Sequence, residues 1–415
     1  MQLRETGHLN LDVGITGTFD VENYGDLLFP LIAGAALARR EPRIRIVPIS
    51  ANGKSKRSWP FDVASVSDIH NLVPKLAAML IGGGQIVRFD THYPVRVSRE
   101  IKVPIAYWLL PAVLAATIGK PVIWNAVGAW TGSPPAPWYT EVIQRVLAAS
   151  HFIGARDVAS QVYLSRLAPK ADIQPLPDTA FSLSRVWPLG KASDRHVQWR
   201  RSLGIATRYV VIQANPAIAT YRSTIETILR SFKDATAVVL PICWCHGDRA
   251  ETFPALDARV ANSSAWLHPK LISEIIARSE LVIASSLHAC ITGLSYGVPV
   301  VRAPVSPLPA DRKFELLSGF ESVALIDDLE AIPRLLERGK RTEPRVVEIA
   351  DRLDRYWDDV ARTAVNPHPS HRDHAMSEML GWLAGVCNDI GQSPIQAPPV
   401  AGSKAAFGSG LSRRK

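Results

Sequence analysis

ELVIASSLHACITGLSYGVPVV, residues 280 to 301, is the stretch that decides the fold. It has the pattern of an apolar strand, a short polar turn, a helix, and a Gly-Val-Pro that leads into a second apolar strand. Strand, helix and strand in this order form a βαβ unit, which builds parallel sheets covered by helices. The stretch therefore predicts an α/β domain.

The same alternation runs through the rest of the chain, where apolar runs typical of buried parallel strands are separated by helical patterns. The predicted strands are LDVGIT, RIRIVPI, AAMLIGGG, PVIWNAVG and HFIGAR in the first half, and YVVIQAN, AVVLPICW, ELVIASS, PVVRAP and SVALI in the second. We expect two doubly wound, Rossmann-like domains that face a shared cleft, which is the arrangement of glycosyltransferase-B type enzymes.

A polar stretch without strand pattern, residues 184 to 204, predicts the domain boundary. We expect an N-terminal domain over 1–190, a C-terminal domain over 191–342 and closing helices over 343–392. The remaining residues, 393–415, are rich in Pro, Gly, Ser and Ala and have little to bury, so we expect a disordered basic tail.

The net charge of +9 is partly local, because four basic residues and no acid lie in that tail. Subtracting four from nine leaves about +5 for the rest of the chain. This mild excess suits an anionic small substrate or an anionic membrane surface. Without a platform of arginine and aromatic residues, it does not predict a nucleic-acid binder.

The sequence predicts a cytoplasmic protein. The first residues lack the apolar region of a signal peptide, and the four cysteines are too scattered for a disulfide framework. One apolar stretch, 103–119, is short for a membrane span and contains two prolines, so we expect a buried helix there. Peripheral contact with the inner face of the membrane stays open.

In open α/β sheets, ligands bind beyond the carboxyl ends of the strands, so the candidate residues lie in strand-end loops. The first loop, 17–28, combines glycines, a helix start and three acids. Asp20, Glu22 and Asp26 can accept hydrogen bonds from sugar hydroxyls or act as a base. Alternatively, Asn23 or Asp26 caps the helix.

Three more loops carry candidates. Gly83 and Gly84 follow an apolar strand, which indicates close approach of a ligand or of the other domain, or else a tight turn. Arg156 stands at a strand end, where a guanidinium suits a carboxylate or phosphate; the alternative is a surface pair with Asp157 or an interdomain bridge. Asp178 ends the last strand of the first domain, where we expect a cap or hinge.

His288 begins the helix of the opening stretch, where helix amides and dipole favour a nearby anion, so it is the candidate acid or base. The run from Cys243 to His246, C-W-C-H, contains three potential metal ligands. No second ligand pair follows at zinc-site spacing, so we expect core packing and no metal or other cofactor.

In this order, the segments resemble the polysaccharide pyruvyl transferase family. The elements that carry the resemblance are Asn23, Gly25 and Asp26 of N-x-G-D, Gly82 to Gly84, Arg156, Asp157 and Ser160 of R-D-x-x-S, and the block from Ser285 to Pro299. They extend over most of residues 11 to 330. The resemblance implies a transferase that moves the pyruvyl group of phosphoenolpyruvate onto two hydroxyls of a sugar, forming a ketal during exopolysaccharide or cell-surface polysaccharide synthesis.

The resemblance further implies an acceptor that is commonly a lipid-linked oligosaccharide at the cytoplasmic face. His288 would be the acid, base or phosphate contact, and Arg156 would hold phosphoenolpyruvate. Asp20, Glu22, Asn23 and Asp26 would receive the acceptor sugar, on which Trp130 and Trp244 could stack. Gly83, Gly84, Ser285, Ser286 and Lys313 complete the expected substrate-binding set.

The chain departs from the family at Ser286, because the family carries an arginine two residues before the histidine. Serine cannot replace a bidentate cation, and Arg302, Arg312 and Lys313 are the nearest substitutes in the sequence. Two alternatives therefore stay open: a nucleotide-sugar-dependent glycosyltransferase of the same fold, and a catalytically silent homologue that binds sugar.

Overall fold

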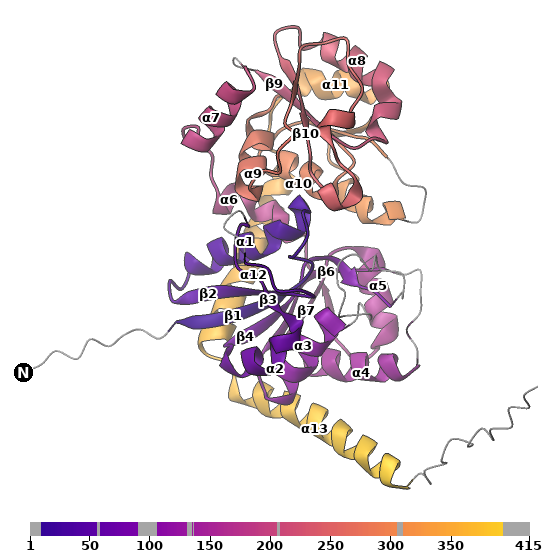
Figure 1. Ribbon diagram of the computed structural model, residues 1–415. Coiled ribbons are helices and arrows are strands. Elements are labelled where there is room, and N and C mark those ends of the chain that lie inside the picture. The colour runs from indigo at the N-terminus through magenta and orange to yellow at the C-terminus, as the bar shows by residue number, and fades with distance from the viewer. Residues whose placement is uncertain are drawn as a thin grey trace, which may run out of the picture.

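The structure is a computed structural model that describes residues 10–55, 59–89, 106–130, 135, 137–205, 208–304 and 310–392. Two parallel sheets lie one above the other, each flanked by helices (Figure 1). The expected tail over 393–415 lies outside the described residues.

The first sheet has the order β3-β2-β1-β4-β6-β7-β8, with β5 paired to β6, and every described pairing in it is parallel. Its strands are β1 (Leu11–Thr16), β2 (Ile44–Ser50), β3 (Ala64–Ser65), β4 (Ala78–Ile81), β5 (Gly84–Val87), β6 (Val122–Ala129), β7 (Phe152–Ala155) and β8 (Ile173–Pro175). Its helices are α1 (Tyr24–Ala38), α2 (Ile69–Leu72), α3 (Ala106–Thr117), α4 (Pro137–Ala148), α5 (Val158–Leu167) and α6 (Leu183–Val186).

The second sheet, order β11-β10-β9-β12-β13-β14, is also parallel throughout its described pairs. Its strands are β9 (Tyr209–Gln213), β10 (Thr236–Leu240), β11 (Val260–Asn262), β12 (Val282–Ala284), β13 (Val300–Arg302) and β14 (Val323–Leu325). Its helices are α7 (Asp194–Ser202), α8 (Arg222–Arg230), α9 (Pro269–Arg278), α10 (Leu287–Ser295) and α11 (Ala331–Arg338). This strand order is that of a doubly wound, dinucleotide-binding type of sheet.

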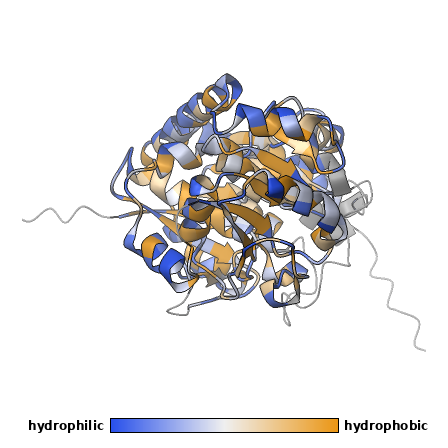
Figure 2. Cartoon of the chain, turned by 90° about the horizontal axis from the view of Figure 1, so that it is seen from above, coloured by the Kyte–Doolittle hydropathy of each residue, from blue (hydrophilic) through white to orange (hydrophobic). Residues whose placement is uncertain are grey.

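The central strands form because their residues are apolar on both faces, and every residue of β4, β6, β9 and β10 is buried. Hydrophobic residues accordingly line the interior, and hydrophilic ones gather on the outer helices (Figure 2). The fold class predicted from the sequence is confirmed. Strands β3, β5, β8 and β11 were not predicted, because two to four residues make too short an apolar run.

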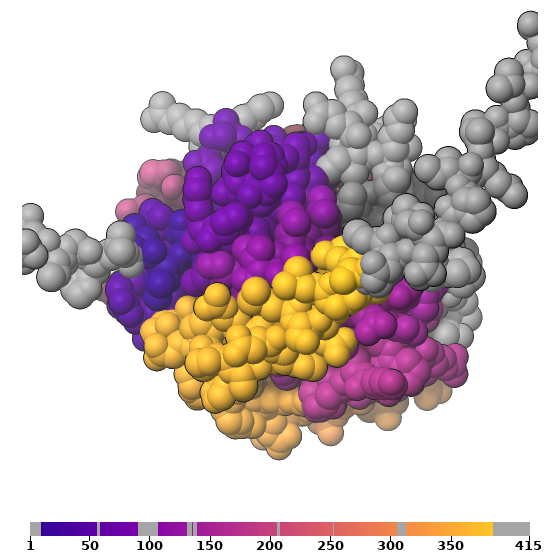
Figure 3. Space-filling view, turned by 90° about the horizontal axis from the view of Figure 1, so that it is seen from below, coloured from indigo at the N-terminus to yellow at the C-terminus, as the bar shows by residue number. Residues whose placement is uncertain are grey.

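After the second sheet, the chain returns to the first. Helix α12 (Pro344–Val365) starts with the proline expected at its first turn and packs on α1 and β1. Helix α13 (Pro369–Gln392) then packs on α3 and α4 and runs across the lower face of the first domain (Figure 3). Over the described ranges, we find no helix with both the length and the apolar character that a membrane crossing needs.

Candidate functional site

The topology places the candidate loops at the switch point of each sheet. In the first sheet, β1 and β4 are neighbours; the loop after β1 leads into α1, whose first turn contains Asp26, and the loop after β4 contains Gly83. In the second sheet, β9 and β12 are neighbours, and His288 follows β12. Helices leave opposite faces of a sheet at this point, so their diverging loops create a crevice for ligands. The two sets of loops meet at the domain junction, where Asn23 pairs with Cys243 and His288 lies beside Asp178.

The start of α1 is held between the domains. Asn23 caps the helix, because its side chain accepts a hydrogen bond from the Gly25 N–H at 3.1 Å. Its backbone forms an antiparallel bridge with Cys243 of the second domain, and the Tyr24 N–H donates to the Ile242 carbonyl at 3.0 Å. The buried Tyr24 hydroxyl lies 2.9 Å from Ser273 Oγ and 2.7 Å from Thr292 Oγ1. These bonds fix α1 against the second domain.

His288 reaches across this junction to a carboxylate of the first domain. Its Nε2 lies 3.4 Å from Oδ2 of Asp178, which is fully buried, while the His288 side chain keeps 12% of its surface exposed. The same Asp178 oxygen lies 3.4 Å from Arg156 Nη1. Burial opposes ionisation of Asp178, but the positive charges of His288 and Arg156 outweigh it and lower its pKa. Asp178 is therefore an anion beside the imidazole.

Arg156 is itself buried, with 4% of the residue exposed. Its Nε lies 3.6 Å from an oxygen of Asp157, whose other oxygen caps α5 through the Ser160 N–H. Its Nη2 has no hydrogen-bond partner among the residues that the structure describes. The alternative expected for Arg156, a pair with Asp157, is present, but inside the protein rather than on its surface.

Asp26 is the second carboxyl of the site, in the first turn of α1. Burial raises its pKa to about 6, although the charges of His288, Lys313 and Arg156 and a hydrogen bond from Asn23 act in the opposite direction. The Asn23 amide donates to Asp26 Oδ2 at 2.8 Å. A carboxyl group with a pKa near 6 exchanges protons close to neutral pH, as acid–base catalysis requires.

Three glycines allow these groups to come together. A Cβ on Gly25 would lie 2.1 Å from His288 Nδ1, so only glycine leaves room for the imidazole against α1. A Cβ on Gly83 would lie 2.3 Å from Phe29, whose ring packs edge-on against His288 at 5.2 Å between centroids. Gly84 has a positive φ of 72° and lies near Asp26. The glycine turn therefore packs against α1, beside Asp26 and Phe29.

The first sheet is irregular beside this turn. The register of β6 shifts between Trp124 and Val127, and Ala126 has a positive φ of 49°, which is unusual for a residue with a Cβ. The neighbouring Asn125 donates to the Gly82 carbonyl at 2.7 Å and accepts from the Tyr356 hydroxyl of α12 at 2.9 Å. The Asn125 side chain therefore connects this irregular part of β6 to the glycine turn and to α12.

Ser285 and Ser286 hold the start of α10. Their N–H groups donate to Gln213 Oε1 at 2.9 and 2.8 Å, and the Ser286 hydroxyl caps the helix. Gln213 in turn donates to the buried Asp248 at 2.9 Å. The position where the family carries arginine is thus occupied by a helix cap, which an arginine cannot supply.

Two of the three cations expected as substitutes, Arg302 and Lys313, lie beside Phe314. The guanidinium of Arg302 lies 4.0 Å from the ring centroid of Phe314, and the Lys313 ammonium lies 5.2 Å from the same ring. Lys313 is half-buried, and its charge acts on both Asp26 and His246. The side chain of Arg312 lies outside the described part of the structure.

Other candidates lie apart from His288. Both carboxylate oxygens of Asp20 are occupied, one by the Ser50 hydroxyl at 2.8 Å and the other by Asn52. Glu22 pairs with Lys54 at 3.2 Å. Of the two tryptophans, Trp130 lies under Arg88, at 5.0 Å, and Trp244 lies under Arg249, at 4.9 Å. A role for these four residues in sugar binding stays a prediction.

Sequence reasoning missed the importance of Asp178. It caps a short helix, as expected, through the Ala180 N–H at 3.0 Å, but its other oxygen contacts both His288 and Arg156. The only signal was its place at a strand end. The core-packing interpretation of C-W-C-H is wrong in part, because Cys243 is buried whereas Cys245 and His246 are exposed.

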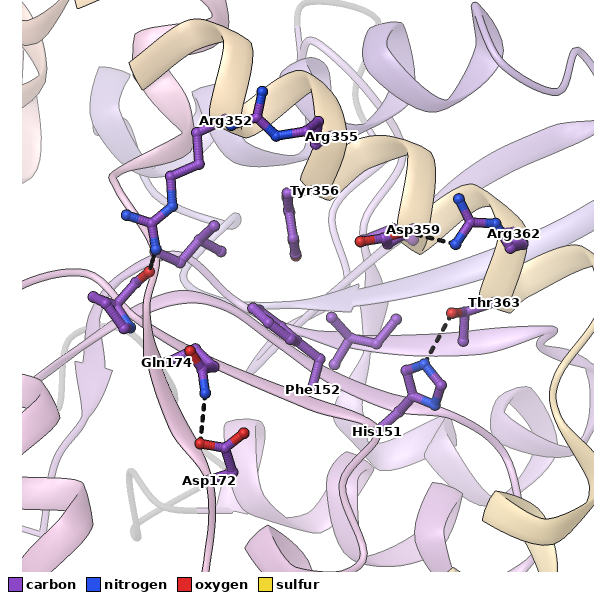
Figure 4. A pocket seen from close by; sticks show the side chains of 14 residues that line it. His151, Phe152, Asp172, Gln174, Arg352, Arg355, Tyr356, Asp359, Arg362 and Thr363 are labelled. Atoms are coloured by element: carbon purple, nitrogen blue, oxygen red, sulfur yellow. Dashed lines mark hydrogen bonds and ion pairs between the residues drawn. The ribbon is translucent and has the colours of Figure 1, made fainter. Parts of the chain in front are cut away.

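A cavity of about 590 Å³ lies away from the cluster around His288 and Asp178 (Figure 4). It is bordered by α12 and by the segments that begin β7 and β8, with His151 and Asp172 on one side and Arg352 and Arg355 on the other. His151 contacts Thr363 there at 3.0 Å. Because His151 and Asp172 precede their strands, this cavity borders the sheet edge opposite the strand ends that form the candidate site.

Two doubly wound, parallel α/β domains that meet at this cluster define the glycosyltransferase-B type of fold. The family model for polysaccharide pyruvyl transferase matches residues 23–306, more than half of the chain. The chain therefore belongs to the polysaccharide pyruvyl transferase family and is a transferase. No curated protein matches it.

Among solved structures, similar ones include S. aureus MnaA with UDP, at 10% identity over 93% of this chain and 99% of that chain, with a TM-score of 0.48. The UDP-GlcNAc 2-epimerase of Methanocaldococcus jannaschii is 10% identical over 84% of this chain and 100% of its own, with a TM-score of 0.49. Phytolacca americana UGT2, complexed with UDP-2fluoro-glucose and pterostilbene, is 10% identical over 92% and 100%, with a TM-score of 0.40. At these identities, the resemblance concerns the fold alone.

Proposed function

We propose that the protein transfers the pyruvyl group of phosphoenolpyruvate to two hydroxyls of one sugar, forming a pyruvate ketal during exopolysaccharide or other cell-surface polysaccharide synthesis in the cytoplasm. The observation that carries the proposal is the contact of His288 with Asp178 across the domain junction, next to a carboxyl group, Asp26, with a pKa of about 6. Family membership supports the same reaction class.

The reaction takes place in two steps at C2 of phosphoenolpyruvate, an addition followed by a substitution. In the first, a sugar hydroxyl oxygen bonds to C2 while the methylene carbon C3 gains a proton and becomes a methyl group. In the second, the other hydroxyl oxygen bonds to C2 while the bond from C2 to the phosphate oxygen breaks. One hydroxyl proton balances the proton gained by C3, and the other leaves with phosphate. The reaction as written uses no redox step and no cofactor.

We assign the two proton transfers to Asp26 and His288. Asp26, which holds its proton to higher pH than an ordinary carboxyl, donates to C3. His288 accepts the proton of the attacking hydroxyl, and the anionic Asp178 at 3.4 Å orients the imidazole. A carboxylate that only orients a histidine need not touch the substrate. The full burial of Asp178 is consistent with this role.

Phosphoenolpyruvate, which is an anion, is bound by cations from both domains. Lys313 belongs to the second domain, acts electrostatically on Asp26, and takes over from the family arginine at Ser286. Arg156 supplies buried positive charge from the first domain, with Nη2 turned to no partner among the described residues. Cations that face developing charge in a water-poor site contribute strongly to catalysis.

The acceptor sugar enters from the side of the β1–α1 loop, which carries Asp20, Glu22 and Asn23, and of the first turn of α1, which carries Asp26. We propose that it is a lipid-linked oligosaccharide, reached from the inner face of the membrane by peripheral contact. The basic excess of the chain supports this contact.

The first test is ligand stabilisation. Phosphoenolpyruvate should raise the Tm of the purified full chain, because a ligand that binds only the folded state stabilises it. Lys313→Ala should abolish most of this shift, whereas Lys233→Ala, the same charge change at an exposed residue of the second domain, should leave it unchanged. A Tm shift with UDP-sugars but none with phosphoenolpyruvate would replace the proposal by a nucleotide-sugar-dependent reaction.

The second test is turnover. Phosphate release from phosphoenolpyruvate, with a lipid extract containing lipid-linked oligosaccharides as acceptor, should fall about 10²- to 10⁴-fold in His288→Gln. His70→Gln, which changes an exposed histidine of the first domain, should keep the wild-type rate. Equal rates in both variants would remove His288 from the mechanism.

A further inference from the structure

The C-W-C-H run forms a compact cluster of metal ligands at the domain junction. It follows β10 and includes a short helical turn, Trp244–His246. One ligand atom from each of Cys243, Cys245 and His246 lies within 4.8 Å of the other two, and the two sulfurs are 3.1 Å apart. Cys243 is buried, whereas Cys245 and His246 are exposed and accessible to an ion.

The loop that carries these ligands is held in place by buried groups other than the ligands. Both oxygens of Asp248 accept hydrogen bonds, from the N–H groups of Ile242 and Cys243 and from the Gln213 and Asn215 side chains, all at 2.9 to 3.0 Å. Gly247 adopts a left-handed conformation, with φ of 90°, which turns the chain directly after His246. The ligands are therefore arranged by the fold before any ion binds.

The chemistry of the ligand set selects a class of ion. Two thiolates and one imidazole are soft ligands that suit Zn²⁺, and they suit Mg²⁺ or Ca²⁺ poorly, since those ions prefer oxygen. Three protein ligands leave the fourth position of a tetrahedral ion open to water or to a small ligand. Among the described residues, this is the cluster of histidine, cysteine and acidic side chains that meets the spacing of a metal site.

We propose that Cys243, Cys245 and His246 bind one Zn²⁺ ion that fastens the two domains at the start of α1. Cys243 bridges to Asn23, the cap of α1, and the Cys245 N–H donates to the Glu22 carbonyl at 3.4 Å. An ion that fixes Cys243 and Cys245 therefore also fixes the loop that places Asp26. The proposal goes beyond the proposed reaction, which needs no metal.

Metal titration of the full chain tests the site. The protein is purified under reducing conditions, stripped of metal with a chelator and titrated with Co²⁺ without oxygen. We expect one equivalent to bind, with near-ultraviolet absorption from thiolate-to-cobalt charge transfer that Zn²⁺ abolishes by competition. Zn²⁺ should also raise the Tm.

Single substitutions locate the ion. Cys245→Ser and His246→Ala, both at exposed positions, should weaken binding at least about tenfold. Cys290→Ser and His70→Ala should bind as wild type, because neither residue belongs to the cluster. The proposal fails if reduced protein shows no charge-transfer band, or if the band persists in both Cys245→Ser and His246→Ala. Neither failure would affect the phosphoenolpyruvate tests above.

Discussion

Asp26 and Asp178 both interact with His288, yet their surroundings shift their pKa values in opposite directions. For Asp26, burial outweighs the nearby positive charges and raises the pKa to about 6. For Asp178, His288 and Arg156 outweigh burial and lower it. Two carboxyl groups tuned apart in this way can carry different roles at one pH, one as a proton donor and one as a fixed anion.

The raised pKa of Asp26 predicts a pH dependence of stability. Between its ordinary pKa of 3.8 and about 6, the folded state binds more protons than the unfolded state, so the free energy of unfolding falls as pH rises through this window. The upper limit of the loss is about 3 kcal/mol. Asp26→Asn keeps an acceptor for Asn23 but cannot ionise, so the variant should be more stable than wild type at pH 7 and lack turnover.

Urea unfolding of both proteins at pH 5 and pH 7 measures this difference. The stability difference between the variant and wild type should grow from pH 5 to pH 7. A difference that stays constant between the two pH values would mean that Asp26 titrates normally in the folded protein.

At the scale of the element, the N-terminus of α1 decides whether the site can assemble. Gly25→Ala should displace His288, because the added Cβ would lie 2.1 Å from Nδ1. We expect a loss of stability of about 1–3 kcal/mol, as in other overpacked positions, and loss of turnover. Gly34→Ala on the same helix is the matched control, since its Cβ would lie 3.7 Å from the nearest side chain, Ile46.

The control should be neutral or stabilised by about 0.5–1 kcal/mol, because alanine favours a helix over glycine. Thermal unfolding and phosphate release, measured for both variants, separate the two effects. If Gly25→Ala keeps wild-type turnover, the close approach of α1 to His288 has no part in catalysis.

The elements differed in how well the sequence predicted them. Long apolar runs such as VIWNAVGA predicted buried parallel strands correctly, because burial on both faces leaves an unambiguous pattern. Short strands such as β8 escaped prediction, since three residues carry no periodicity. The strained Ala126 also could not be foreseen, because alanine carries no sign of a left-handed conformation.

At the scale of the whole molecule, the site consists of residues more than a hundred positions apart. His288 was a candidate from its place at a helix start, but its partner Asp178 had no signal beyond a strand end. Contacts between domains depend on how two separate surfaces meet, and local patterns do not encode that. The sequence therefore predicted the loops of the site but not the pairing within it.

The proposed membrane contact makes a prediction for the complete chain. Lys404, Arg413, Arg414 and Lys415 lie in a segment without acids, and each basic residue near an anionic surface contributes about 1 kcal/mol. Deleting residues 393–415 should weaken binding to phosphatidylserine-containing vesicles at least about tenfold, as measured by co-sedimentation at low salt. Pure phosphatidylcholine vesicles are the control. Unchanged binding after the deletion would remove the tail from membrane contact.

The return of α12 to the first domain has a consequence for synthesis on the ribosome. The surface of α1 and β1 that α12 covers is translated more than 300 residues earlier than α12 itself, which begins at Pro344. In the nascent first domain, the apolar surface of α1 and β1 therefore stays uncovered until the second domain and α12 have been translated. We expect the nascent chain to depend most on chaperones during this interval. We also expect a chain that is truncated before residue 344, or fused to another protein there, to be prone to aggregation.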